Sequence, residues 1–99
     1  MAHLVIWSRR AIDDVDAIAA YIAEDSEAFA ASVVRTILEK ARRLSDFPLI
    51  GRVVPEFDDE ALREIFAYSY RIIYEVSGSE VTIAAVIHGK RLLEMAIKP

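Results

Sequence analysis

The spacing of apolar residues changes part-way along the chain, and this change constrains the fold more than any other feature. Between residues 12 and 44 apolar side chains recur every three or four positions, which is the period of an amphipathic helix. Between residues 62 and 88 runs rich in β-branched and aromatic residues are separated by short turns, as in an antiparallel sheet. Helices followed by strands predict an α+β fold in which one face of the sheet covers the helices.

The first half is expected to form one short strand and two helices. A β-rich run, Leu4–Trp7, ends at Ser8, a good N-cap residue, and the apolar stripe that follows predicts a helix over residues 8–24. Asp25 or Ser26 can cap a second helix. Because so short a turn joins them, the two helices are expected to lie antiparallel. Their stripes are Ile12, Val15, Ile18, Ala19 and Ile22 in the first helix, and Ala30, Val33, Val34, Ile37, Ala41 and Leu44 in the second.

The second half is expected to form a C-terminal antiparallel sheet of three or four strands, packed against the helix hairpin. Residues 46–60 are rich in turn formers and are predicted to be a loop. Arg71 alternates with the residues of the middle strand that face the helices, so we expect it on the opposite, exposed face. Residues 90–97 form a short tail that is compatible with a helix. The strands are predicted at Leu62–Ala67, residues 70–76 and Glu80–His88.

Composition narrows the class of protein further. A chain of 99 residues is expected to form one domain over residues 1–99. Without cysteine it has neither disulfides nor thiolate metal sites, and its N-terminus lacks the pattern of a signal peptide. No run approaches the roughly 20 apolar residues of a membrane span. We therefore expect a cytoplasmic protein without membrane contact, metal or cofactor.

Charge bears on the kind of partner. The net charge of −4 disfavours direct binding of nucleic acid, because such binding depends on neutralising phosphates. A local basic patch is still compatible with this sequence, and the alternative is an ordinary solvated surface of mixed charge. The residues that would form the patch are Arg63, Arg71, Lys90 and Arg91.

The strand half carries a distinctive string of residues. It consists of Arg63-Glu64, then Tyr70-Arg71-Ile72-Ile73-Tyr74-Glu75-Val76, then Val86-Ile87-His88-Gly89-Lys90-Arg91. This string resembles the C-terminal signature of the RelE/ParE toxin superfamily of bacterial type II toxin–antitoxin systems, and is closest to its ParE-like branch. The helical half adds to the resemblance with Ala11, Ile12, Asp14, Ile18, Tyr21 and Ile22.

The resemblance implies a toxin, of the kind associated with plasmid stabilisation, that a partner antitoxin keeps inactive. The expected partner is a ParD-like protein that wraps over the helices and the sheet, and contact with DNA is expected only through that complex. An apolar surplus in the chain fits such a partner. The sequence does not identify which residues bind the antitoxin.

Several residues of the string also have structural interpretations, which stay open at this stage. The tyrosines of the middle strand alternate with apolar residues and are favoured as core aromatics. His88, at a strand end, is either a packed histidine or a general acid. Gly89 is expected where a side chain would crowd a turn. Arg71 is either a functional residue or one that pairs with a carboxylate, the candidates being Glu64 and Glu75.

The superfamily has two functional branches, which are RelE-like enzymes that cut messenger RNA on the ribosome and ParE-like proteins that block DNA gyrase. Cutting RNA requires a base, an acid and cations on the phosphate, and RelE-like enzymes use lysines, arginines and often a C-terminal tyrosine. Here the strand where the lysines are expected reads Leu62-Arg63-Glu64, and the tail reads Glu94-Met95-Ala96-Ile97. What remains for a nuclease is Arg71, His88 and Arg91, with Glu56 or Glu64 as a base. Whether Arg71 and His88 share a face depends on the hairpin register around Gly78.

We therefore predict a non-enzymatic gyrase inhibitor without catalytic residues. Lys90 and Leu92 depart from the usual ParE pattern, which bears on the identity of the target. Two alternatives stay open, namely a ribosome-dependent endoribonuclease and a non-toxic relic that only binds antitoxin. The residues predicted to contact the target are Arg63, Arg71, His88, Lys90 and Arg91.

Overall fold

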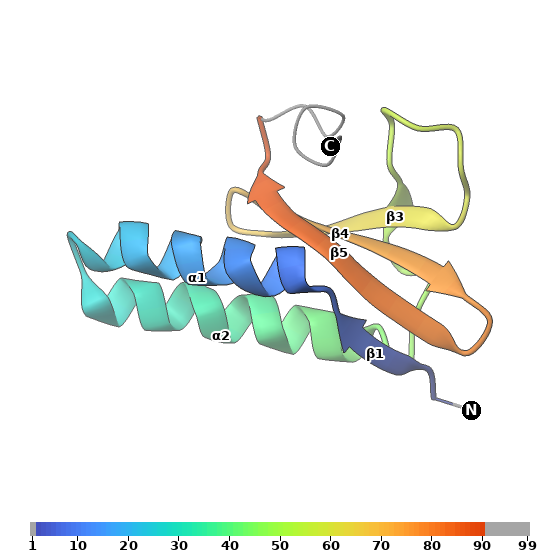
Figure 1. The fold of residues 1–99 in the computed structure, drawn as a ribbon, viewed down its shortest axis with the longest axis horizontal. Coiled ribbons are helices and arrows are strands. Elements are labelled where there is room, and N and C mark those ends of the chain that lie inside the picture. Colours follow the sequence, from blue (N-terminus) through green and yellow to red (C-terminus); the bar gives the residue numbers. More distant parts are fainter. Residues whose placement is uncertain (1, 91–99) are drawn as a thin grey trace.

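The computed structural model describes residues 2–90, which form two helices and a five-stranded sheet (Figure 1). The two helices lie side by side and antiparallel, as predicted. The elements, in chain order, are β1 Leu4–Trp7, α1 Arg9–Ala23, α2 Glu27–Arg43, β2 Arg52–Val53, β3 Leu62–Ala67, β4 Tyr70–Ser77 and β5 Glu80–His88.

Both helices begin at the serines that the sequence offers as caps. The Ser8 hydroxyl oxygen accepts a hydrogen bond from the Ala11 backbone N–H at 3.0 Å, and the Ser26 oxygen accepts one from Phe29 at 3.0 Å. The Ser8 hydroxyl also donates to the Ala84 carbonyl in β5 at 3.0 Å. The start of α1 is therefore fixed both to its own first turn and to the sheet.

The sheet has the strand order β1-β5-β4-β3-β2 and is mixed rather than purely antiparallel. The α+β fold is confirmed, and so are the N-terminal strand and the C-terminal antiparallel sheet, whose four strands, β2 to β5, lie within the predicted count of three to four. Two of the pairings in the complete sheet were not predicted. β1 pairs in parallel with β5, and two residues of the expected loop, Arg52–Val53, pair with β3. Neither pairing follows from local pattern. β1 and β5 lie far apart in the sequence, and β2 is too short to show an alternation of apolar and polar residues.

The core between helices and sheet follows the predicted stripes with one exception. Ile12 is 44% exposed and points away from the core, whereas its neighbour Ala11 is fully buried. The small side chain of Ala11 allows α1 to approach the sheet closely. The buried residues of this core are Ala11, Val15, Val33, Ile37, Ala41, Leu44, Ala67, Ile72, Tyr74, Val81, Ile83 and Val86.

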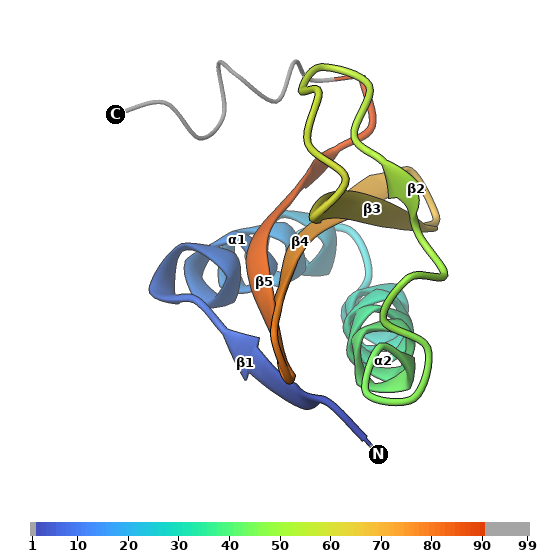
Figure 2. The same ribbon diagram turned by 90° about the vertical axis from the view of Figure 1, so that its right-hand side faces the viewer.

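The opposite face of the sheet is also covered. Beyond β2 the chain rises on the side of the sheet away from the helices, and residues of this loop pack there (Figure 2). The resulting second core consists of Val54, Ile73, Ala85 and Ile87, with Phe57 and Leu62 against them. A residue of β4 that points away from the helices is therefore buried under the loop instead of being exposed.

A β-bulge in β5 sets which residues face the helices at the end of that strand. Tyr74 pairs with Ile83 but Ile73 pairs with Ala85, so Ala84 is an extra residue. The bulge has its own support from α1, because Asp14 accepts a hydrogen bond from the Val86 N–H at 2.9 Å. One inserted residue exchanges the two faces of a strand beyond it.

Tyr74 links the sheet to the loop that precedes β2. Its ring is fully buried, and its hydroxyl oxygen accepts a hydrogen bond from the Gly51 backbone N–H at 2.9 Å. A Cβ at Gly51 would lie 2.5 Å from the Glu64 carbonyl oxygen, so glycine is required for this close approach. Burial raises the pKa of the Tyr74 phenol above its ordinary value of 10.0, although the Gly51 N–H and the positive charge of Arg63 act in the opposite direction.

We predict that stability falls as the pH rises above about 10, and that Tyr74 contributes to this fall. The unfolded phenol loses its proton near that pH while the native phenol keeps it, so deprotonation favours the unfolded state until the native pKa is passed. Tyr74→Phe should remove this contribution. It should also lower the free energy of unfolding at neutral pH by about 1–3 kcal/mol, because the buried Gly51 N–H loses its acceptor. Urea denaturation at several pH values measures both effects, with the exposed Tyr21→Phe as the control expected to behave like the wild type.

Candidate functional site

The guanidinium of Arg71, near the start of β4, is held by two carboxylates. Its Nε donates to Glu64 Oε1 at 2.6 Å, and its two terminal nitrogens donate to the two oxygens of Glu56 at 2.7 and 2.8 Å. Glu64 comes from β3 and Glu56 from the loop between β2 and β3. The other oxygen of Glu64 accepts from Arg52 Nε at 2.5 Å. We call these four residues the ion cluster.

The ion cluster is largely removed from water. Arg71 is 4% exposed and Glu64 1% exposed, whereas the Arg52 side chain reaches the surface. The hydrogen bonds from Arg71 to Glu56 raise the pKa of its guanidinium above the ordinary value, against the effect of burial, and the bonds to Glu64 add to the rise. Both carboxylates therefore stabilise the charged form of Arg71.

The prediction that Arg71 lies on an exposed face is thus wrong, because the loop after β2 covers that face. Of the two carboxylates expected to pair with it, Glu64 does so, while Glu75 is exposed near the far end of β4. Glu56 was considered only as a catalytic base, and its pairing with Arg71 arises from the folding of the loop.

Arg63 stabilises the backbone of the loops beside β3. Its Nε donates to the Glu60 carbonyl at 2.9 Å, and its Nη1 donates to the Gly51 carbonyl at 2.9 Å and the Leu49 carbonyl at 3.4 Å. These bonds hold the chain on both sides of β2. Arg63 in β3 and Arg71 in β4 were both predicted to contact the target. In the structure both make contacts within the chain.

His88 and Lys90, in contrast to Arg71, are exposed where β5 ends. His88 pairs with Tyr70 across the sheet, with ring centroids 5.9 Å apart, and its Nδ1 accepts a hydrogen bond from the Lys90 N–H at 3.2 Å. Arg71 pairs with Ile87. Since neighbours along a strand point to opposite faces, His88 and Arg71 lie on opposite faces of the sheet.

The glycine that follows His88 has the predicted role. Gly89 N–H donates to the Ser69 carbonyl at 2.6 Å, and a Cβ at Gly89 would come within 3.0 Å of the same oxygen. Arg91, the fifth residue predicted to contact the target, and the predicted helical tail after Lys90 lie outside the described residues.

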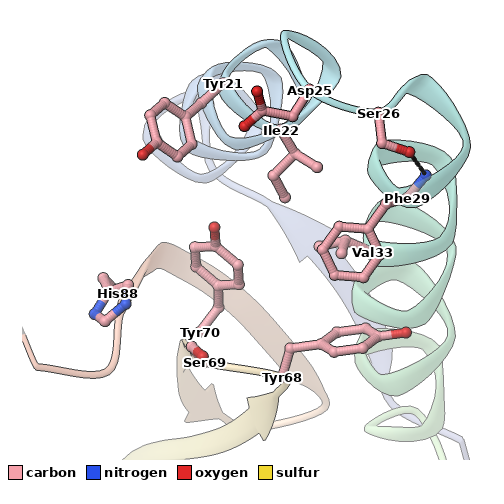
Figure 3. A pocket seen from close by; sticks show the side chains of 10 residues that line it. All are labelled: Tyr21, Ile22, Asp25, Ser26, Phe29, Val33, Tyr68, Ser69, Tyr70 and His88. Atoms are coloured by element: carbon pink, nitrogen blue, oxygen red, sulfur yellow. Dashed lines mark hydrogen bonds between the residues drawn. The ribbon is translucent and has the colours of Figure 1, made fainter.

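A pocket of about 440 Å³ opens between the helix hairpin and the turn from β3 to β4 (Figure 3). Four aromatic residues, Tyr21, Phe29, Tyr68 and Tyr70, line it together with His88. We call it the aromatic pocket. The sequence did not predict this pocket, although Tyr21 and Phe29 are large aromatics that lie off the apolar stripes of their helices, which is a usable signal. Its remaining lining residues are Ile22, Asp25, Ser26, Val33 and Ser69.

A second surface is the outer side of the helix hairpin. Two adjoining hollows there are lined almost entirely by apolar side chains, and they share Val34 and Leu38. Ile12 and Leu38 are 44% and 42% exposed. We call this surface the hairpin groove, and its other apolar residues are Trp7, Val15, Ala19, Ala20, Ala23, Ala30 and Ala31.

Residues 2–90 contain neither a candidate metal site nor a candidate membrane-spanning helix. No group of three or more histidine, aspartate or glutamate side chains in this part of the chain is arranged to hold a metal ion. Neither of its helices is long and apolar enough to cross a membrane.

Comparison with known proteins identifies the family. The family model described as the ParE toxin of the type II toxin–antitoxin system parDE matches residues 5–93. The chain belongs to the ParE toxin family. This match spans both helices, all five strands and the ion cluster. No curated protein sequence matches the chain.

Solved structures support the same fold. The chain is similar to a structure described as the chromosomal ParDE system of P. aeruginosa, with a TM-score of 0.72, 22% identity, and coverage of 88% of this chain and 96% of that one. It is also similar to the E. coli toxin RelE, solved as a double arginine-to-alanine mutant in the free state. For RelE the TM-score is 0.65 and the identity 19%, with coverage of 91% of this chain and 86% of that one. The RelE/ParE-like fold and the role as a type II toxin are thus established for this ParE family member.

We predict that Arg71→Ala lowers the free energy of unfolding by about 3–5 kcal/mol, because it leaves the buried Glu64 carboxylate without its main partner. Arg52→Ala is the matched control. It removes the exposed arginine from the same carboxylate and should cost no more than about 1 kcal/mol. Chemical denaturation of both variants measures the difference. Equal losses would show that the buried pair is not what stabilises the loop. A loss of toxicity in Arg71→Ala can be interpreted only together with this measurement, because an unfolded variant would also be non-toxic.

Proposed function

We propose that this ParE family toxin inhibits DNA gyrase by binding it, without cutting RNA, and that a ParD-like antitoxin neutralises it. The name of the matching family and the similar ParDE system support a parDE-type pair. The choice between gyrase inhibition and RNA cleavage rests mainly on the ion cluster.

An RNA-cutting site of the RelE type needs cations that are free to contact a phosphate. In this chain Arg71 directs its donors to Glu64 and Glu56 inside the sheet-and-loop core. Bringing a phosphate to Arg71 would place a third negative charge beside two carboxylates, which electrostatics opposes. Glu64 also stands in the strand where RelE-like enzymes are expected to have lysines.

The acid–base part of a nuclease is separated from the arginine as well. His88 faces the side of the sheet that holds Tyr70 and the helices, and Arg71 faces the loop. A histidine and an arginine that act on one phosphate must reach it from one side. This separation, which the bulge in β5 produces, favours a protein-binding function over RNA cleavage.

Target contact is most readily made by the end of β5. His88 and Lys90 are exposed there, and they lead directly into Arg91 and the tail. Arg63 and Arg71, which were predicted to contact the target too, are better suited to positioning because their donors are occupied by carbonyls and carboxylates. We propose that His88, Lys90 and Arg91 contact gyrase.

The hairpin groove is the surface that we propose for the antitoxin. It joins exposed Ile12 and Leu38 with a row of alanines, so the backbone of a partner can approach closely. A toxin that is stored as a complex needs such an apolar face, and a segment with apolar residues at helical spacing fits it. The family resemblance, in which antitoxin wraps over the helices, supports the same partner.

We predict that controlled expression of the chain without antitoxin stops DNA synthesis before protein synthesis. Pulse-labelling of both in the same culture makes the comparison, and purified protein should then inhibit supercoiling by gyrase. His88→Gln separates contact from chemistry, because glutamine can keep a polar contact with gyrase but cannot transfer a proton. It should strongly reduce the activity of a nuclease and reduce gyrase inhibition only modestly. An early collapse of protein synthesis, abolished by His88→Gln, would replace this proposal by the RNA-cutting one.

We predict that Leu38→Glu weakens antitoxin binding by at least about tenfold while leaving toxicity intact, since a carboxylate in the hairpin groove must be desolvated. Phe47→Glu makes the same change at an exposed apolar residue outside the groove and should leave binding unchanged. Calorimetry with purified antitoxin measures the affinity. If Phe47→Glu is the more damaging variant, the antitoxin binds elsewhere.

A further inference from the structure

We propose that the aromatic pocket is a binding site for a cationic side chain, an arginine, presented by a protein partner. The inference does not depend on which protein is the toxin's target. It rests on the residues that converge on the pocket, on the backbone of one of them, and on its charge.

The aromatic rings come together from separate parts of the chain. Tyr21 lies in α1, Phe29 in α2, Tyr70 in β4 and Tyr68 in the turn that precedes β4. In Figure 3 the Tyr70 ring points from the strand toward the helices, and the rings of Phe29 and Tyr68 stand on one side of the opening. Phe29 and Tyr68 meet edge to face with centroids 5.8 Å apart. Such an arrangement presents ring faces, and not only ring edges, to an incoming group.

Three of these four rings are exposed, whereas Tyr70 is partly buried and packs against the core. Tyr21 is 72% exposed, Tyr68 56% and Phe29 49%. The contact between Phe29 and Tyr68 leaves about half of each side chain open to water. Large aromatics gathered in one exposed hollow are typical of binding sites, because packing alone would have buried them.

Tyr68 has an unusual backbone that keeps its ring at the pocket. Its φ is +55°, and it is the first of two residues that join β3 to β4. In the next hairpin the corresponding position is Gly78, with a φ of +59°. Glycine suits this conformation and a bulky residue does not. A tyrosine held there against its backbone preference indicates that the ring is needed at this point.

The charge of the pocket decides what it can bind. Of its ten lining residues, Asp25 is the one carboxylate and none is lysine or arginine. Within residues 2–90 the Asp25 carboxylate makes no hydrogen bond or ion pair. Glu24, the C-cap of α1, and Glu27, the first residue of α2, are close to it in the sequence and add negative charge to this end of the helix hairpin. Ring faces are also electronegative, so the pocket as a whole favours a cation.

Arginine fits these features better than other side chains do. Its planar guanidinium stacks on aromatic faces, and its forked donors can reach the Asp25 carboxylate at the edge of the pocket. A nucleotide would stack on the same rings, but its phosphate would be repelled by the Asp25 carboxylate. An aliphatic side chain would gain burial and leave the carboxylate unused.

The test is a titration of the full chain, followed by the backbone amide signals in ¹H–¹⁵N NMR spectra. The probe is N-acetyl-arginine methylamide, and its matched control is the citrulline analogue, which has nearly the same shape without the charge. We expect saturable shifts at the amides of Asp25, Phe29, Tyr68 and Ser69 in the millimolar range. The citrulline analogue should bind at least about fivefold more weakly. Added salt should weaken the arginine probe and not the citrulline one.

Variants at exposed positions separate the contributions. Tyr21→Phe keeps the ring and should bind the arginine probe like the wild type, whereas Tyr21→Leu keeps the apolar bulk without the ring and should bind several-fold more weakly. Asp25→Asn should weaken it similarly. Circular dichroism confirms that each variant is folded, which is expected because both side chains are exposed.

Three results would overturn the proposal. The first is equal binding of the arginine and citrulline probes, or wild-type binding by Tyr21→Leu, which would make the pocket merely apolar. The second is a set of shifts at the same amides with uridine monophosphate but not with the arginine probe, which would make it a nucleotide site. The third is no saturable shift with the arginine probe, which would make the aromatic residues structural only.

Discussion

The salt bridges from Arg71 to Glu64 and Glu56 are the interaction on which the rest of this structure depends. They join the strand β4, the strand β3 and the loop after β2, the same three segments that contribute to the second apolar core. A charge pair this deeply buried is costly unless every partner is present, because each ion has lost its water. The loop must therefore stay closed over the sheet for the arginine to be tolerated. Arg63 and Tyr74 hold the neighbouring loop, which precedes β2, by hydrogen bonds to the carbonyl and the N–H of Gly51, respectively.

Closure of that face has a functional consequence. In a member of this superfamily the same sheet can in principle carry RNA chemistry, but here an apolar cluster and neutralised charges fill the space under the loop. The open surfaces to which we assign roles among residues 2–90 are the hairpin groove, the aromatic pocket and the end of β5 with His88 and Lys90. Each is suited to a protein partner, by apolar area in the first case and by charge in the others. The three surfaces that we propose to bind proteins, together with the closed sheet face, fit an inhibitor that is itself inhibited.

The aromatic pocket and the hairpin groove also differ in the kind of partner that they favour. The groove is lined by alanine, valine and leucine side chains and selects for shape, so many apolar segments would fit it. The pocket combines aromatic faces with one carboxylate and selects for charge and planarity. Together they would allow a partner to be both tightly bound and specifically recognised, since specificity comes from groups that reject the wrong partner.

Local pattern was sufficient for much of the fold. Ser8 and Ser26 cap the helices because their hydroxyls reach the first-turn N–H groups, and the apolar stripes bury Val15, Val33 and Ile37 as their spacing requires. The three long strands begin and end within about one residue of their predicted limits. Period and capping act over a few residues, so the sequence determines them directly.

The site was decided by tertiary structure, because its contacts join residues that are distant in the chain. The pairing of β1 with β5 and the cover formed by the loop have no local signal, so Arg71 was expected on an exposed face and is buried. His88 was recognised from sequence, but its face depends on one extra residue, Ala84, whose bulge is stabilised by Ser8 and Asp14 from α1. The sequence by itself determined the elements, the family resemblance and the residue types available for function. Only the packing of helix, loop and sheet decided which of those residues meet, because register and burial are set by contacts that form when the whole chain is folded.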